Sequence, residues 1–231
     1  MGATSDGGAF GLSATLTTLT IVFVAFEGGD GSGKSTQSEQ LAQRLRAAGH
    51  HVVLTREPGA GTIGAQIRTI VLDHGPSELT ARAEALLFAA DRAQHVASIV
   101  RPGLAAGSVV ITDRYVDSSI AYQGVGRELG VAAVRTLSDF ATGGLVPDLT
   151  VLLDVPSTTG RSRIAQHGGQ VADRIESEPD VMHTQVRQAY LDRAAAAPQR
   201  YLVLDGTRPA GDLATEIGNT VLASLGAAVD R

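Results

Sequence analysis

The chain has 231 residues, 43% of them hydrophobic and 19% charged, which is enough for one α/β domain with a substantial core. The formal net charge of −5 argues against a broad basic surface, so we expect neither nucleic acid nor a membrane as a partner. There is no cysteine, which excludes disulfides, thiolate metal sites and a cysteine nucleophile, and we expect a cytoplasmic location.

The first part of the chain contains an apolar, nearly uncharged segment, Ala9–Phe26. It does not fit a secretory signal, because no lysine or arginine precedes Lys34. Gly11 and Ser13 also interrupt it, which makes it a poor membrane span. We therefore expect residues 1–19 to form a flexible leader and residues 20–226 to form a single domain.

Short apolar runs then alternate with longer segments of helical period. The runs predicted as strands buried on both faces are Ile21–Glu27, His51–Thr55, Ser108–Thr112, Leu149–Asp154 and Tyr201–Leu204. The segments predicted as helices are Gly33–Ala48, Ile63–Asp73, Thr80–Ala106, Val131–Thr142, Arg161–Gln166, Pro179–Ala197 and Asp212–Leu225. This alternation predicts a doubly wound, parallel, five-stranded sheet flanked by helices, with ligands at the carboxyl ends of its strands.

A phosphate-binding loop, or P-loop, follows the first predicted strand, because residues 28–35 read Gly-Gly-Asp-Gly-Ser-Gly-Lys-Ser. Its glycines let backbone N–H groups point at phosphates, and the next helix adds the partial positive charge of its N-terminus. Lys34 is the single lysine among 19 basic residues, at the position where a slim ammonium bridges phosphate oxygens. We predict that ATP binds to Gly28, Gly29, Asp30, Gly31, Ser32, Gly33, Lys34, Ser35 and Thr36.

We expect Mg²⁺ to bind together with the nucleotide in such a loop. Ser35 should contribute its hydroxyl oxygen to the ion. Asp113 ends the apolar run Val109–Asp113 and is the expected second anchor for hydrated Mg²⁺, the alternative being a cap for the next helix. Arg114 beside it favours the phosphate role, because guanidinium groups pair with phosphates through two hydrogen bonds.

With these residues in hand, the chain resembles the thymidylate kinases, P-loop nucleoside monophosphate kinases that phosphorylate dTMP, from about Phe23 to about Gly218. The motifs that carry the resemblance are Phe26-Glu27-Gly28-x-Asp30, Thr55-Arg56-Glu57-Pro58-Gly59, Leu87-Phe88-x-x-Asp91-Arg92, Asp113-Arg114-Tyr115, Ser118-Ser119, Ala121-Tyr122-Gln123-Gly124 and Asp173-Arg174-Ile175-Glu176. The resemblance implies the P-loop kinase fold with a short lid at about residues 160–176.

The resemblance also implies a pocket for the thymine base. Phe88 would stack on the ring, and Arg92 would donate to thymine O4, an acceptor that cytosine replaces with an amino donor. Without the resemblance, Phe88 lies in an apolar helix stretch and would be assigned to the core. Arg92 alone would be assigned to a solvated helix face.

The rest of the substrate site follows from the same resemblance. Arg68 and Arg114 would clamp the substrate phosphate, and Asp30 would accept from the sugar 3′-hydroxyl and orient the acceptor. Tyr122 would crowd the 2′ position against ribonucleotides. The remaining implied contacts are Gln123 beside the sugar and base, Ser118 and Ser119 as further hydrogen-bonding groups, and Glu57 near the phosphate and metal.

The lid differs from that of the relatives. Gly31 leaves the P-loop without an arginine, which resembles the subgroup whose catalytic arginine comes from the lid. We expect Arg163 to stabilise transition-state charge, Arg174 to bind phosphate or close the lid, and Arg161 to lie against adenine. The alternative for each is an ordinary solvated helix residue. The catalytic set is then Lys34, Asp30, Arg163 and Arg174.

The implied reaction is direct, in-line transfer of the ATP γ-phosphoryl group to dTMP, giving dTDP for nucleotide biosynthesis. Asp205-Gly206-Thr207, after the last strand, either holds adenine through backbone contacts or is simply a turn. Two rival functions stay open: a kinase for another pyrimidine monophosphate or a nucleoside, and an ATP-dependent switch without kinase chemistry. The resemblance also implies a homodimer.

Overall fold

Five parallel strands form the centre of the protein, which is described by a computed structural model covering residues 22–75, 78–166 and 173–229. The strands are β1 (Phe23–Glu27), β2 (Val52–Arg56), β3 (Val109–Asp113), β4 (Leu149–Asp154) and β5 (Tyr201–Asp205), in the order β2-β3-β1-β4-β5. The predicted fold class, a parallel five-stranded sheet flanked by helices, is confirmed. The predicted leader lies outside the described residues.

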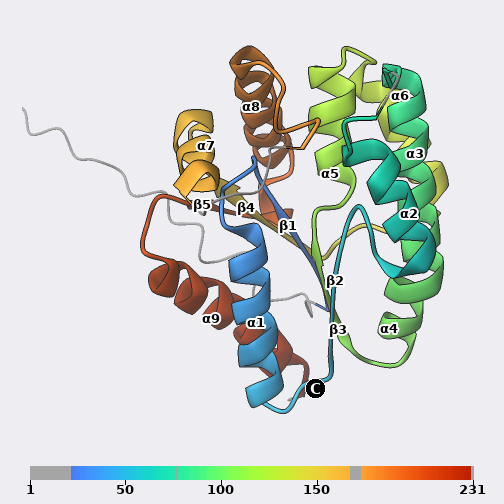
Figure 1. Ribbon diagram of the computed structural model, residues 1–231. Coiled ribbons are helices and arrows are strands. Elements are labelled where there is room, and N and C mark those ends of the chain that lie inside the picture. Colours follow the sequence, from blue (N-terminus) through green and yellow to red (C-terminus); the bar gives the residue numbers. More distant parts are fainter. Residues whose placement is uncertain (1–21, 76–77, 167–172, 230–231) are drawn as a thin grey trace, which may run out of the picture.

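Strand β1 explains why the sheet carries helices on both faces. All five of its residues are buried. Val24 and Phe26 point into the core on one face, whereas Phe23 and Ala25 point into the core on the other. A strand that is apolar on both sides is stable only when both faces are covered, which gives the layered arrangement in Figure 1.

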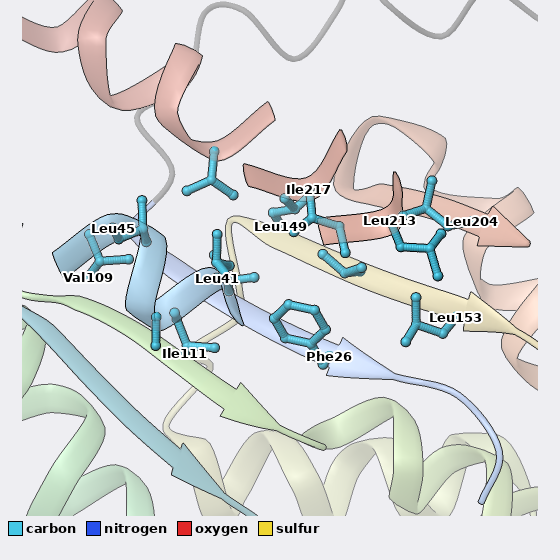
Figure 2. Close-up of a cluster of buried hydrophobic side chains, with 14 of the residues drawn as sticks. Phe26, Leu41, Leu45, Val109, Ile111, Leu149, Leu153, Leu204, Leu213 and Ile217 are labelled. Carbon is cyan, nitrogen blue, oxygen red and sulfur yellow. The ribbon is translucent and has the colours of Figure 1, made fainter. Parts of the chain in front are cut away.

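The first face is covered by α1 (Lys34–Ala47) and α9 (Ala210–Val229), which contact each other. Leu41 and Leu45 of α1 meet Ile217 of α9 above Phe26, and all four side chains are at most 2% exposed (Figure 2). This packing fixes the start of α1, and with it the P-loop, against the end of β1.

The second face carries most of the remaining helices. Val96 and Val100 pack against Phe23 and Val110 of the sheet, and α8 (Asp180–Ala196) packs against β4 and β5. The other helices are α2 (Gly61–Leu72), α3 (Ala81–His95), α4 (Arg101–Ala105), α5 (Val116–Ser119), α6 (Val131–Thr142) and α7 (Ser157–Gln166). Among the described residues, no helix is both long and apolar enough to cross a membrane.

Two segments differ from the sequence-based expectation. The helix predicted over Thr80–Ala106 contains a π-helical stretch, η2 (Val96–Val100), between α3 and α4. The segment Val116–Gly126, for which no helix was predicted, folds as α5 followed by a second π-helical stretch, η3 (Ile120–Gly126). Gly124 and Gly126 lower its helix propensity, and burial against α8 and α6 overrides that preference.

Ionisable residues lie at the carboxyl ends of the strands, along one edge of the sheet. Each strand ends on an ionisable residue: Glu27, Arg56, Asp113, Asp154 and Asp205. Arg56 lies beside Asp113 in the register of β2 and β3, and Phe26 lies beside Asp113 in that of β1 and β3. The functional residues therefore gather at this edge, as expected for an open α/β sheet.

Candidate active site

The P-loop connects β1 to α1 through three glycines with positive φ: Gly28 (138°), Gly31 (70°) and Gly33 (95°). A Cβ on Gly28 would lie 2.5 Å from the carbonyl oxygen of Leu153, so only glycine fits there. The ammonium of Lys34 donates to the carbonyl oxygen of Gly29 at 2.8 Å, inside the loop. Burial, together with the charge of Arg114, lowers the pKa of Lys34 to about 8.

Ser35 and Asp113 meet at the base of the loop. The Ser35 hydroxyl donates to Asp113 Oδ2 at 2.6 Å, across the gap between α1 and β3. Two oxygen donors of this kind suit Mg²⁺, which prefers few protein ligands and keeps water or phosphate oxygens for the rest. Among the described residues, no group of three or more His, Asp or Glu side chains is arranged to hold a metal ion.

Asp30 of the P-loop forms a hydrogen-bonded group with Arg114 and Tyr122. The Arg114 guanidinium donates to Asp30, and the Tyr122 hydroxyl donates to the same carboxylate at 2.7 Å. Burial alone would raise the pKa of Asp30, but the charges of Arg114 and Lys34 outweigh it and lower that pKa. Asp30 is therefore an ionised acceptor with both oxygens oriented.

A cavity of about 260 Å³ opens between this group and helices α2, α3 and η3. All ten residues that the resemblance assigns to dTMP line it, and so do Lys34, Ser35 and Asp113. Five of the predicted ATP residues do not line this cavity: Gly28, Gly29, Ser32 and Gly33 of the P-loop and Thr36 of α1. The acceptor side and the phosphate side of the predicted site thus share one space.

Arg92 is 2% exposed, so the solvated interpretation of this residue is wrong. Four of its five N–H donors are used: by Glu57 at 2.8 Å, by the Tyr115 carbonyl and Ser119 hydroxyl at 3.0 Å each, and by the Ser138 hydroxyl at 3.4 Å. One Nη1 donor is left, and Arg92 lines the cavity. Phe88 is 9% exposed and belongs both to the core and to the cavity wall.

Sequence reasoning missed His95, which braces Glu57. His95 Nδ1 lies 2.7 Å from Glu57 Oε1, and His95 Nε2 lies 2.9 Å from the Thr55 hydroxyl. His95 is fully buried. The spacing of Arg92 and His95, three residues apart on one helix face, was the available signal, but only the fold brings Glu57 between them.

Glu27 is a second residue that the sequence did not single out as functional. It is fully buried, and it accepts from the Tyr115 amide at 2.9 Å and the Ser118 hydroxyl at 2.6 Å. The Ser118 hydroxyl in turn accepts from Arg114 at 3.0 Å. Burial and the neighbouring charge of Asp117 raise the pKa of Glu27 to about 7. Ser118 is thus held between Glu27 and Arg114 at the cavity wall.

The three lid arginines occupy different places. Arg163 donates to the Gly206 carbonyl at 3.0 Å and to the Gly31 carbonyl at 3.5 Å, so it lies on the P-loop. Arg174 donates to Glu84 at 2.7 Å and to the Val71 carbonyl, and it does not line the main cavity. Arg161 pairs with Asp180 at the surface. Residues 167–172 of the predicted lid lie outside the described residues.

The contact between α7 and the P-loop gives a steric reason for glycine at position 31. A Cβ on Gly31 would lie 2.1 Å from the carbonyl oxygen of Gly160 in α7. A Cβ on Gly160 would lie 2.2 Å from the carbonyl oxygen of Asp30. Two glycines therefore let the backbones touch, and an arginine at position 31 would push α7 away from the loop.

A parallel sheet with a P-loop after its first strand, a buried lysine in that loop and an arginine-lined cavity beside it define a nucleotide phosphotransferase of the P-loop class. The family model for thymidylate kinase matches residues 26–217. The chain belongs to the thymidylate kinase family.

Individual relatives agree with the family match. The chain is 53% identical over 196 residues to a thymidylate kinase of Leifsonia xyli, covering 85% of this chain and 92% of the relative. It is 50% identical to that of Clavibacter michiganensis, covering 90% and 98%. A crystal structure of thymidylate kinase from Ehrlichia chaffeensis superposes with a TM-score of 0.68 at 31% identity, covering 85% of this chain and 95% of that one.

Glu27 generates a prediction about stability. Because its pKa is about 7 in the folded protein and near 4.5 when exposed, the folded state binds more protons between these values. Its contribution to stability is therefore fully present below about pH 4.5 and is lost as the pH rises through 7. Wild type should lose stability from pH 5 to pH 8 because of this group, whereas Glu27→Gln should not. The free energy of unfolding of the variant relative to wild type should therefore rise over this range, by on the order of a few kcal/mol.

Urea unfolding of both proteins at pH 5 and pH 8 measures this difference. Glu39→Gln, at an exposed carboxyl of α1, is the control and should follow wild type at both values. A Glu27→Gln protein with the same pH dependence as wild type would show that Glu27 is not protonated on folding.

Proposed function

We propose that the protein catalyses the reaction of this family, the transfer of the γ-phosphoryl group of ATP to dTMP with formation of dTDP. The reaction would take place in the 260 Å³ cavity beside the P-loop. One observation carries the proposal. The lysine of the P-loop and all ten residues assigned to dTMP face the same cavity. Donor and acceptor phosphates bound there would lie next to each other.

Positive charge explains how two phosphate groups could approach. Arg68 and Arg114 line the cavity. Burial lowers the pKa of Arg68, and the nearby charge of Arg56 lowers it further. A phosphate dianion would neutralise this cluster, which supports the assignment of Arg68 and Arg114 as clamps. No general base is needed, because a phosphate monoester oxygen is already largely deprotonated near neutral pH.

The donor side would use Lys34 and the P-loop amides to bind the β- and γ-phosphates. Ser35 and Asp113 would hold Mg²⁺, which supplies charge neutralisation on the transferred group. Arg163 already lies against the P-loop, which supports its assignment to transition-state charge. Arg174 is paired with Glu84, so a role on phosphate would require it to leave that carboxylate.

The acceptor side would use Phe88 and the remaining Nη1 donor of Arg92 for the base. Because Arg92 is fixed by four hydrogen bonds, its free donor cannot reorient at low cost. A pyrimidine with an amino group instead of O4 would leave that donor without an acceptor. Tyr122, fixed on Asp30, would lie beside the sugar.

An acceptor panel tests the proposed function. We expect dTMP to be phosphorylated at least tenfold more efficiently than dCMP or UMP at equal concentration, because only dTMP satisfies Arg92 and the sugar site. ADP release coupled to an indicator reaction, with and without each acceptor, measures this. Faster turnover of dCMP or UMP than of dTMP would contradict the assigned pocket. A rate of ADP release that does not depend on any acceptor would favour an ATP-dependent switch.

We also propose that the protein is a cytoplasmic homodimer, with α2, α3 and α6 at the interface. These helices contact one another in sequence, α2 with α3 and α3 with α6. They carry exposed apolar side chains, namely Ile63, Ile70, Leu86 and Phe140, the last being 88% exposed. Exposed apolar groups on adjacent helices favour a protein interface. The use of ATP supports a cytoplasmic location.

Light scattering after size-exclusion chromatography tests the dimer. Wild type should elute as a dimer, and Phe140→Glu should be largely monomeric, because the substitution would bury a charge. Val181→Glu, at a valine on α8 that is 65% exposed, is the control and should stay dimeric. A monomeric wild type at micromolar concentration would contradict the proposal.

A further inference from the structure

His183, on α8, carries a buried hydrogen-bonding atom that the described protein does not satisfy. The residue is 8% exposed, and its Nε2 has no hydrogen-bond partner among the described residues. A buried polar atom that is left unpaired has lost its hydrogen bonds to water without gaining a replacement, which is unfavourable. A partner from outside the protein, such as water or a ligand group, is therefore favoured.

His183 faces a small cavity of about 20 Å³ beneath α7. The cavity lies between the P-loop, at Gly29 and Asp30, and the helix α8. A water molecule needs about 10–15 Å³ of such space and two to four polar partners. The volume fits one water, and Asp30, Glu176, Tyr122 and His183 around it offer enough hydrogen-bonding groups.

The small cavity adjoins the main one. Asp30, Tyr122 and Glu176 line both spaces. Asp30 accepts from Arg114 through Oδ1 and from Tyr122 through Oδ2, which leaves about two of its four lone-pair directions free. A hydroxyl group that reaches Asp30 from the main cavity would therefore lie next to the small cavity that His183 lines.

We propose that His183 holds one water molecule in this small cavity, and that the water hydrogen-bonds the sugar 3′-hydroxyl together with Asp30. Water both donates and accepts, so it can pair with Nε2 whether or not that nitrogen carries a proton. His183 is then a specificity-determining residue for the 3′ position of the acceptor. This inference rests on the proposed function, in which Asp30 receives the 3′-hydroxyl of dTMP.

The test compares dTMP with 3′-deoxy-dTMP as acceptors. Wild type should prefer dTMP, because the analogue leaves Asp30 and the water without a partner. His183→Phe removes the polar atom and fills the space, and it should lower this preference about tenfold, through a higher KM for dTMP with little change for the analogue. His183→Gln keeps a polar end and should retain most of the preference.

Met182→Leu is the matched control, because Met182 is the neighbouring buried residue on α8 and does not line the small cavity. It should keep the wild-type preference. An equal loss on both acceptors in His183→Phe would show a packing role only, and an unchanged preference would show no role at all; either result overturns the inference. Absence of activity on dTMP in wild type would instead overturn the proposed function.

A high-resolution crystal structure of the wild type gives a readout that does not depend on activity. It should show an ordered water within hydrogen-bond distance of His183 Nε2. An empty cavity, or a His183 ring that reaches another protein group, would overturn the inference.

Discussion

Close backbone contact around the P-loop is the constraint on which the site depends. Gly28 lies against the carbonyl of Leu153 at the end of β4, and Gly31 lies against the carbonyl of Gly160 in α7. Side chains at these positions would separate the loop from the sheet on one side and from α7 on the other. Because the loop stays in place, its amides, Lys34 and the start of α1 all face the same edge of the sheet.

Buried charge is then organised around that loop. Asp30 joins Arg114 and Tyr122, while Glu27 fixes Ser118 behind them. Asp30 and Arg114 are paired before any substrate arrives, which is the preorganisation that phosphoryl transfer requires of a protein. Arg92 is also held in place by its hydrogen bonds, which leave a single donor for a base. Selectivity and charge neutralisation therefore use one connected set of side chains.

The sequence predicted those features of the fold that depend on a local pattern of residues. The five strands and the P-loop were predicted from apolar runs and glycine spacing, and β4 and α6 have the predicted bounds. The π-helical stretches were not, because tertiary packing selects them against propensity. His95 and Glu27 act through residues that are far away in the chain. The spacing of Arg92 and His95 indicates a shared helix face, but only the fold shows which carboxylate lies between them. The positions of Arg161, Arg163 and Arg174 likewise depend on how α7 meets the loop.

Calorimetric titration of the folded protein with ATP and Mg²⁺ tests most directly whether the loop and its lysine bind a triphosphate. Wild type should release heat with a stoichiometry near one per chain. Lys34→Ala should bind at least tenfold more weakly, because the buried ammonium is lost. Arg208→Ala, at a surface arginine paired with Glu216, should bind like wild type. No detectable binding to the folded wild type would contradict the account.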